Sequence, residues 1–171
     1  MITIMGAILL ISASSMLGIR KAGELSARAN ALAAVVSGLE LLRGEMCTLQ
    51  SPMPQVTERL SESAPGEMKH FFRRLNHSLA QLGDHSFYEL WSSAVGQSPE
   101  LMLRREETDC LTRLGLSLGR YVLREQEAVI NQCIAQFSDF YELAREEARV
   151  QGRLYTGLGV AAGLMVSVVL L

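Results

Sequence analysis

Apolar residues recur at helical spacing along almost the whole chain, and no stretch shows sustained two-residue alternation. Steps of three and four residues place apolar side chains on one face of an α-helix, whereas alternation would indicate a strand. Breaks containing proline or glycine, at residues 50–54, 63–66 and 96–99, fall between these helical stretches. The pattern therefore predicts an all-α fold.

The first helix of the middle region continues from the N-terminal segment and carries one apolar face. The residues of this face are Leu25, Leu32, Val35, Leu39, Leu42, Met46 and Leu49. A proline-containing break ends the helix. Ser51 is the expected N-cap of a second helix, with Pro52 in its first turn. The second helix is expected to run to about Ser61, with Val56 and Leu60 facing inward.

Four more helices are expected in the remainder of the middle region. The third spans residues 68–82 and the fourth residues 87–95, and a glycine follows each. Residues 98–100 (Ser-Pro-Glu) have the composition of a capped helix start, which predicts a fifth helix extending to Leu118. The sixth keeps its helical spacing up to Arg153. With no breaker there, we expect it to continue into the C-terminal segment as one helix.

Side-chain charges stop abruptly near both ends of the chain. Met1–Ile19 and Leu154–Leu171 contain no Lys, Arg, Asp or Glu. A helix of about 18 residues rises about 27 Å, close to the ~30 Å hydrocarbon thickness of a bilayer. We therefore expect transmembrane helices at residues 1–19 and 154–171, with a helical domain at residues 20–153 between them.

Cations flank both apolar segments on the side of the domain. Arg20 and Lys21 follow the first segment, and Arg149 and Arg153 precede the second. Cationic flanks remain in the cytoplasm, so the domain is expected there. The alternative for the first segment is a cleaved signal peptide. A signal peptide carries positive charges before its apolar core, whereas here they follow it. The alternative for the second is a buried C-terminal helix, which its length and lack of strongly polar groups disfavour.

The sequence contains no motif for catalysis or cofactor binding. A Gly-Lys-Ser/Thr phosphate loop, a G-x-S-x-G elbow and an H-E-x-x-H pair are all absent. His70 and His77 stand two helical turns apart, about 10 Å, too far to share one metal ion. The net charge of −2 comes from interspersed residues, without the basic face that nucleic acid requires. We therefore expect that the protein is not an enzyme and that it binds no cofactor, no metal ion and no nucleic acid.

Three cysteines, Cys47, Cys110 and Cys133, lie far apart in the sequence and form no C-x-x-C pair. In a cytoplasmic domain, isolated cysteines of this kind are typical of reduced thiols in the core. We therefore expect three reduced core thiols.

Acidic residues are the candidate contacts for a protein partner. Glu45 lies near the end of the first expected helix, and Glu142 and Glu146 lie on the outer face of the sixth helix. Complementary charge steers association and sets the register of a complex. The alternative interpretation is a solvated helix face that binds nothing.

Small residues step by four along the C-terminal segment, at Gly159, Gly163 and Ser167. This spacing lets two helix backbones approach closely in lipid. The packing partner would be the first membrane segment, through Ser14 and Gly18, or a second copy of the chain. Chance also places such spacing in many membrane segments.

Two stretches carry a resemblance to a known family. The first is LELLRGEM at residues 39–46, followed by Ser-Pro-Met at residues 51–53; the second is LGLSLG at residues 114–119, with Gln126 and Ile130 beyond it. Both stretches resemble patterns of the stage III sporulation protein AB family. The first is similar to a leucine-rich run that contains Glu-Ile and is followed by Thr-Pro-Leu. The second is similar to a double Leu-Gly that is followed by a Gln and an Ile.

Two positions depart from the pattern of that family. Thr48 stands where the family has a tyrosine, and Tyr121-Val122 stands in place of a Ser-Asp pair. Loss of that Asp removes an expected helix N-cap and leaves the start of the sixth helix, near Arg120, undefined.

The resemblance implies an endospore-forming bacterium and a location in the mother-cell membrane around the forespore. It implies a non-enzymatic platform in a secretion-like transenvelope complex, with the other stage III proteins, including a secretion-type ATPase, as partners. The domain would be similar to that of the type II secretion platform protein F, an antiparallel bundle of about six helices. Membrane lipid and a second copy of the chain are further expected partners.

The alternative function is a membrane-anchored helical adaptor in signalling or regulation. The lack of an extracytoplasmic domain weighs against it, because a sensor would have nothing outside the membrane with which to sense.

Overall fold

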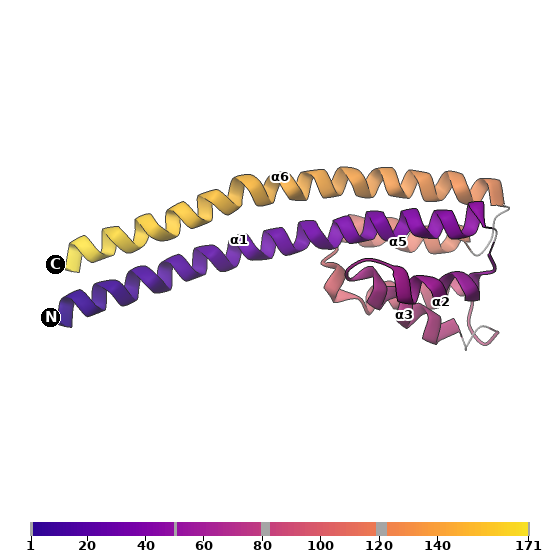
Figure 1. Cartoon of the computed structure of the whole chain (residues 1–171), viewed down its shortest axis with the longest axis horizontal. Helices are drawn as coiled ribbons and strands as arrows, with labels where there is room; N and C mark the ends of the chain where they lie inside the picture. The colour runs from indigo at the N-terminus through magenta and orange to yellow at the C-terminus, as the bar shows by residue number, and fades with distance from the viewer. Residues whose placement is uncertain (1, 50, 80–82, 119–122, 171) are drawn as a thin grey trace. The chain divides into compact units, whose positions relative to one another are not determined.

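The computed structural model describes residues 2–49, 51–79, 83–118 and 123–170. Within these residues it has six α-helices and no β-strand, so the predicted all-α class is confirmed (Figure 1). The helices are α1 (Ile2–Arg43), α2 (Met53–Ser63), α3 (Met68–Ser78), α4 (Phe87–Gly96), α5 (Arg105–Leu118) and α6 (Leu123–Leu170). A π-helical turn, η1 (Gly44–Thr48), extends α1, and a 3₁₀ turn, η3 (Pro99–Leu101), precedes α5.

The chain forms two compact units. The core unit spans Asn30–Tyr141, and the paired-helix unit combines Met1–Ala29 with Glu142–Leu171. Helices α1 and α6 contribute to both units. The expected unbroken sixth helix is confirmed, because α6 continues for 48 residues without a change of secondary structure.

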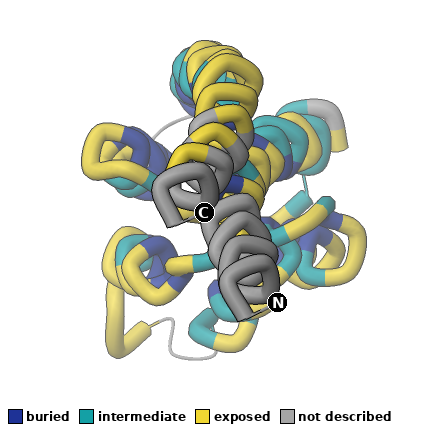
Figure 2. Tube along the Cα trace, turned by 90° about the vertical axis from the view of Figure 1, so that its left-hand side faces the viewer, coloured by how far each residue is buried: buried dark blue, intermediate teal, exposed yellow. Residues whose placement is uncertain are grey.

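The core unit is held together by buried apolar residues, which recur along its helices and are dark blue in Figure 2. The predicted apolar face of α1 contributes Leu32, Val35, Leu39 and Leu42, all of which are 0% exposed. Complete burial of one such side chain stabilises the fold by about 1.5–3 kcal/mol. The three- and four-residue spacing therefore identified the inner face of this part of α1, but the prediction is wrong for Leu49, which is 58% exposed after η1.

Aromatic side chains join α3, α4 and α5. Trp91 packs edge-on against Phe71, with ring centroids 5.1 Å apart, and its indole N–H donates to the Leu111 carbonyl at 2.8 Å. The ring lies directly over Gly115, where a Cβ atom would come within 2.2 Å of it. This contact gives the first Leu-Gly of the second matched stretch a structural reason, since any side chain at residue 115 would displace the indole.

Two predicted helix starts are wrong. Ser51 does not cap α2; no side chain caps that helix, and the Ser51 hydroxyl instead donates to Glu45 at 3.5 Å. Residues 98–100 do not begin the fifth helix, because Met102 adopts a left-handed conformation (φ 52°) that ends η3 and separates it from α5. The backbone N–H of Arg104 donates to the buried carboxylate of Glu107 at 2.7 Å, which closes the first turn of α5.

The third helix is shorter than predicted, and the fourth matches the prediction. Helix α3 ends at Ser78, and residues 80–82, where the prediction extended it, lie outside the described residues. Helix α4 covers Phe87–Gly96 and begins with a capping box between Ser86 and Glu89. Its paired hydrogen bonds lower the pKa of the Glu89 carboxyl. The predicted onset near Arg120 falls within residues 119–122, which also lie outside the described residues.

In the paired-helix unit, α1 and α6 run in opposite directions, and their outer ends lie at the same end of the unit (Figure 1). The two helices approach closely at Gly152, where a Cβ atom would stand 3.5 Å from the Cβ of Ala22. One described stretch, Met16–Cys47, is long and apolar enough to cross a membrane, although 44% of its most apolar window is buried. Side chains before Met16 and most of those after Tyr155 lie outside the described residues, so two spans stay a prediction.

Candidate interaction surfaces

The first candidate partner residue, Glu45, is engaged inside the core unit. Its carboxylate pairs with Arg59 on α2 at 3.0 Å, and its side chain is only 19% exposed. The hydroxyl of Ser51 donates to the same oxygen atom. Glu45 therefore links η1 to α2, and a basic partner would have to displace Arg59 to reach its carboxylate.

The other two candidates, Glu142 and Glu146, lie one turn apart on α6 and are exposed. Both oxygens of Glu146 accept from Arg149, at 2.9 and 2.8 Å, and this hydrogen bonding lowers the pKa of the Glu146 carboxyl. These residues belong to the paired-helix unit and Glu45 belongs to the core unit. Their role in partner binding stays a prediction.

The predicted packing residues Gly159, Gly163 and Ser167 fall inside α6, but their surroundings lie outside the described residues, as do those of Ser14. Gly18, the other predicted counterpart, is buried in the paired-helix unit. The close approach that the structure describes is instead between Ala22 and Gly152. The sequence carried a signal for it, because Gly18 and Ala22 repeat the four-residue spacing of small residues.

The paired-helix unit exposes large apolar side chains on both of its helices. The described ones are Met16, Leu17, Ile19, Leu143, Val150, Leu154, Tyr155 and Met165. Exposed apolar side chains that gather on one part of a protein mark a site of contact with lipid or with another protein. Leu143 and Val150 lie among charged residues, whereas the others lie in or beside the charge-free ends, which begin next to Arg20 and Arg153 and are the candidate membrane contact.

The two borders of this apolar surface lie at a similar level in the unit. Hydrogen bonding and charge from Glu24 raise the pKa of the Lys21 ammonium, and Tyr155 of α6 contributes in the same direction. The approach of Gly152 to Ala22 brings α6 and α1 together beside these residues. Cations and tyrosines are the residues that favour a membrane–water interface. The arrangement places such residues from both helices together.

Sequence reasoning missed a basic face on α3. The helix contains no Asp or Glu, and it exposes His70, Arg73 and His77 at steps of three and four residues. Arg74, beside them, pairs with Glu100 and also donates to Ser98 at 3.3 Å, which ties the helix to η3. Arg73 supplies a positive charge on this face, with no acidic residue of α3 to oppose it, and such a face attracts a partner of opposite charge. The signal was present as the run Lys69-His70-Phe-Phe-Arg73-Arg74.

The prediction of three core thiols is confirmed for two of them. Cys110 and Cys133 are buried, whereas Cys47 is half-buried at the end of the first helical stretch. All three are free thiols. Burial, with the charge of Glu127, raises the pKa of Cys47.

Comparison with known proteins identifies one family. A sequence model described as stage III sporulation protein AB matches residues 3–171, nearly the whole chain. No curated protein and no solved structure matches the chain. The expected likeness to the type II secretion platform protein F therefore stays a prediction.

Proposed function

Because the chain belongs to the stage III sporulation protein AB family, we propose that it acts in sporulation as a non-enzymatic membrane platform. In this role it would hold other proteins of the mother-cell-to-forespore complex at the membrane around the forespore. The family membership supports the sporulation role directly. The platform role rests on the architecture, in which a packed helical core unit is continuous in sequence with an exposed apolar helix pair.

The exposed apolar side chains of the paired-helix unit are the observation that carries this proposal. Met16 and Leu17 are 64% and 66% exposed, and Leu154 is 58% exposed. Exposure of apolar surface to water, instead of burial in hydrocarbon, costs about 25 cal/mol of free energy per Å². Insertion of Met1–Ile19 and Leu154–Leu171 as two spans would cover this surface and leave Arg20 and Arg153 at the cytoplasmic interface.

The core unit is the proposed docking site for a secretion-type ATPase. Its candidate surface is the basic face of α3 (His70, Arg73 and His77), and the competing surface is the acidic outer face of α6 (Glu142 and Glu146), which belongs to the paired-helix unit. The α3 face carries no acidic residue, whereas Glu146 already pairs with Arg149. The basic face is therefore the stronger candidate, with an acidic surface on the partner.

Co-purification from sporulating cells tests the platform role. The full-length chain, extracted in mild detergent, is expected to bring down the ATPase and other stage III proteins, and Arg73→Glu is expected to reduce ATPase recovery selectively. Glu142→Lys is the matched variant on the acidic face and is expected to retain the ATPase. The reverse result would move docking to the acidic face. If both variants still recover the ATPase, neither surface is its docking site. Recovery of a kinase or response regulator in place of the ATPase would favour the signalling adaptor.

Helix α6 is the proposed route by which force on the core unit reaches the membrane, because it is continuous from Leu123 to Leu170. Two glycines inserted between Ala148 and Arg153 should interrupt it and abolish spore formation while the protein stays in the membrane fraction. The same insertion after Asp84, in the exposed turn before α4, is the control and should be tolerated. Normal sporulation with the first insertion would contradict the coupling.

A further inference from the structure

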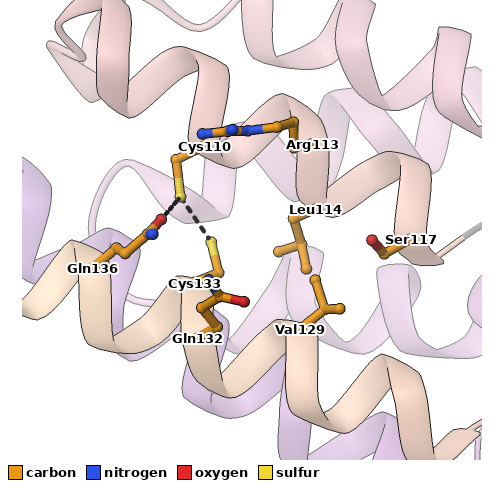
Figure 3. Close-up of a pocket in the computed structure, with 8 residues that line it drawn as sticks. All are labelled: Cys110, Arg113, Leu114, Ser117, Val129, Gln132, Cys133 and Gln136. Carbon is orange, nitrogen blue, oxygen red and sulfur yellow. Dashed lines mark hydrogen bonds between the residues drawn. The ribbon is translucent and has the colours of Figure 1, made fainter.

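Two thiols that are 23 positions apart in the sequence meet between α5 and α6. The sulfur atoms of Cys110 and Cys133 lie 3.5 Å apart, and both residues are free thiols (Figure 3). A disulfide needs a sulfur–sulfur distance of about 2.05 Å. The two sulfurs would therefore have to approach by about 1.5 Å for the bond to form.

Cys110 borders two adjoining hollows, and Cys133 borders one of them. One hollow, of about 220 Å³, is lined by Cys110 and Cys133 together with Arg113 and Gln136. The second, of about 400 Å³, shares Cys110, Arg113 and Gln136 with the first. A small reagent thus has room beside the Cys110 sulfur, although the thiol itself is largely covered by protein.

The surroundings distinguish the two thiols. The hydrogen bond with Cys133 lowers the pKa of Cys110, and the positive charge of Arg113, which extends beside it in Figure 3, acts in the same direction. The contact with Cys110 and burial raise the pKa of Cys133. The Cys110 thiol donates to the Gln136 side-chain oxygen at 3.0 Å; on ionisation, rotation of that amide would turn its NH₂ group toward the thiolate. Cys110 is therefore the thiol that ionises first.

We propose that Cys110 and Cys133 form a thiol–disulfide modification site whose substrate is a low-molecular-weight disulfide. The Cys110 thiolate attacks one sulfur of the reagent, which forms a mixed disulfide at Cys110 and releases one small thiolate. Cys133 then loses its proton, attacks the Cys110 sulfur and displaces the second small thiolate. The protein dithiol is oxidised by two electrons, the reagent is reduced to two thiols, and the new bond ties α5 to α6.

Cys47 provides an internal contrast within the same chain. It is more exposed than Cys110, but it has no second sulfur beside it, and burial and Glu127 raise its pKa. Reactivity of a cysteine follows its thiolate fraction as well as its exposure. Cys110 is therefore expected to react before Cys47 despite its lower exposure.

Oxidised glutathione is the probe for this site. The reduced full-length protein, in detergent and without air, is treated with the probe, blocked with iodoacetamide and mapped by mass spectrometry. The wild type is expected to lose two hydrogen atoms in a Cys110–Cys133 link and to keep Cys47 as a thiol. The Cys47→Ser variant should behave identically. In shorter labelling by iodoacetamide alone, Cys110 should react roughly tenfold faster than Cys47.

Variants that replace one cysteine at a time identify the attacking thiol. Cys133→Ser should accumulate glutathione on Cys110, because no second thiol can displace it, whereas Cys110→Ser should leave Cys133 unmodified. A link that involves Cys47, three unchanged thiols in the wild type, or glutathione on Cys133 in Cys110→Ser would each overturn the proposal. The wild-type mapping needs no variant, so the proposal stays testable if a serine substitution destabilises the core unit.

Discussion

The two parts of α1 use the same residue type in opposite ways. Leu17, in the paired-helix unit, is 66% exposed, whereas Leu39, in the core unit, is 0% exposed. Both belong to one uninterrupted helix. Leu39 is covered by other helices of its own unit, and Leu17 has no comparable cover from protein. The difference shows that an apolar helix position predicts burial but does not predict what covers the side chain.

Helix α6 repeats this contrast in the reverse order along the chain. Ile130 and Phe137, in the core unit, are fully buried, and Leu143 and Val150, in the paired-helix unit, are 65% and 46% exposed. The core unit therefore folds around its own apolar residues. In the paired-helix unit we expect lipid to cover the apolar residues of the charge-free ends, such as Leu17 and Leu154, which makes the two units respond differently to the same substitution.

The largest expected effect comes from one charge placed in each part of α1. Leu39→Glu would leave an unpaired charge in the core unit, and it should cost about 3–5 kcal/mol of the free energy of unfolding. Leu17→Glu should leave the unfolding of the core unit unchanged and instead weaken membrane insertion, by at most about 3 kcal/mol. Urea unfolding monitored by Trp91, the chain's only tryptophan, measures the first effect, and retention in alkali-washed membranes measures the second.

An equal loss of unfolding free energy in the two variants would contradict this contrast, because it would mean that protein covers Leu17 as closely as Leu39. Leu41→Glu is the control within the core unit, since Leu41 is 41% exposed and belongs to the same helix. Its unfolding midpoint should move little.

Alanine at two buried glycines gives the next largest effect. At Gly115 the added Cβ would come within 2.2 Å of the Trp91 ring, and displacement of the indole should cost about 1–3 kcal/mol. At Gly152 the added Cβ would meet Ala22 at an ordinary contact of 3.5 Å. Gly152→Ala should therefore be neutral or stabilise the helix by up to about 1 kcal/mol. Thermal unfolding followed by circular dichroism compares both variants with the wild type.

Two ion pairs give the smallest expected difference. Glu45 and Arg59 link η1 to α2, with Glu45 mostly covered, whereas Lys21 and Glu24 form an exposed pair within one helix. A double-mutant cycle with alanine should give a coupling of about 0.2–1 kcal/mol for the first pair. The second cycle should give no measurable coupling at physiological salt. A larger coupling for Lys21–Glu24 would show that the paired-helix unit excludes water at that level.

Helix positions were predictable where periodicity was long and unbroken. The inner residues of α1, the whole of α4 and the continuity of α6 all follow from local spacing. The failures lie at helix starts. Ser51 and Ser98 have the composition of N-caps, but Ser51 donates to Glu45, and Ser98 donates to the Ala94 carbonyl at 2.7 Å. Each hydroxyl donates to a group in the segment that precedes it instead of accepting from the helix that follows, and composition does not show this choice.

The candidate sites were less predictable than the fold. An acidic residue such as Glu45 is visible in the sequence, but its pairing with Arg59 depends on how η1 meets α2. The basic face of α3 could have been predicted from its composition and helical spacing, since it involves a single helix. The dithiol could not, because the spacing of Cys110 and Cys133 resembles no redox motif.

By itself the sequence determined the helical class, the charge-free ends and the family, because these depend on spacing and composition along the chain. Tertiary structure alone decided that Cys110 meets Cys133 and that Trp91 covers Gly115. The physical reason is that a helical period specifies the face on which a side chain lies, whereas the neighbour of that face depends on how separate helices pack.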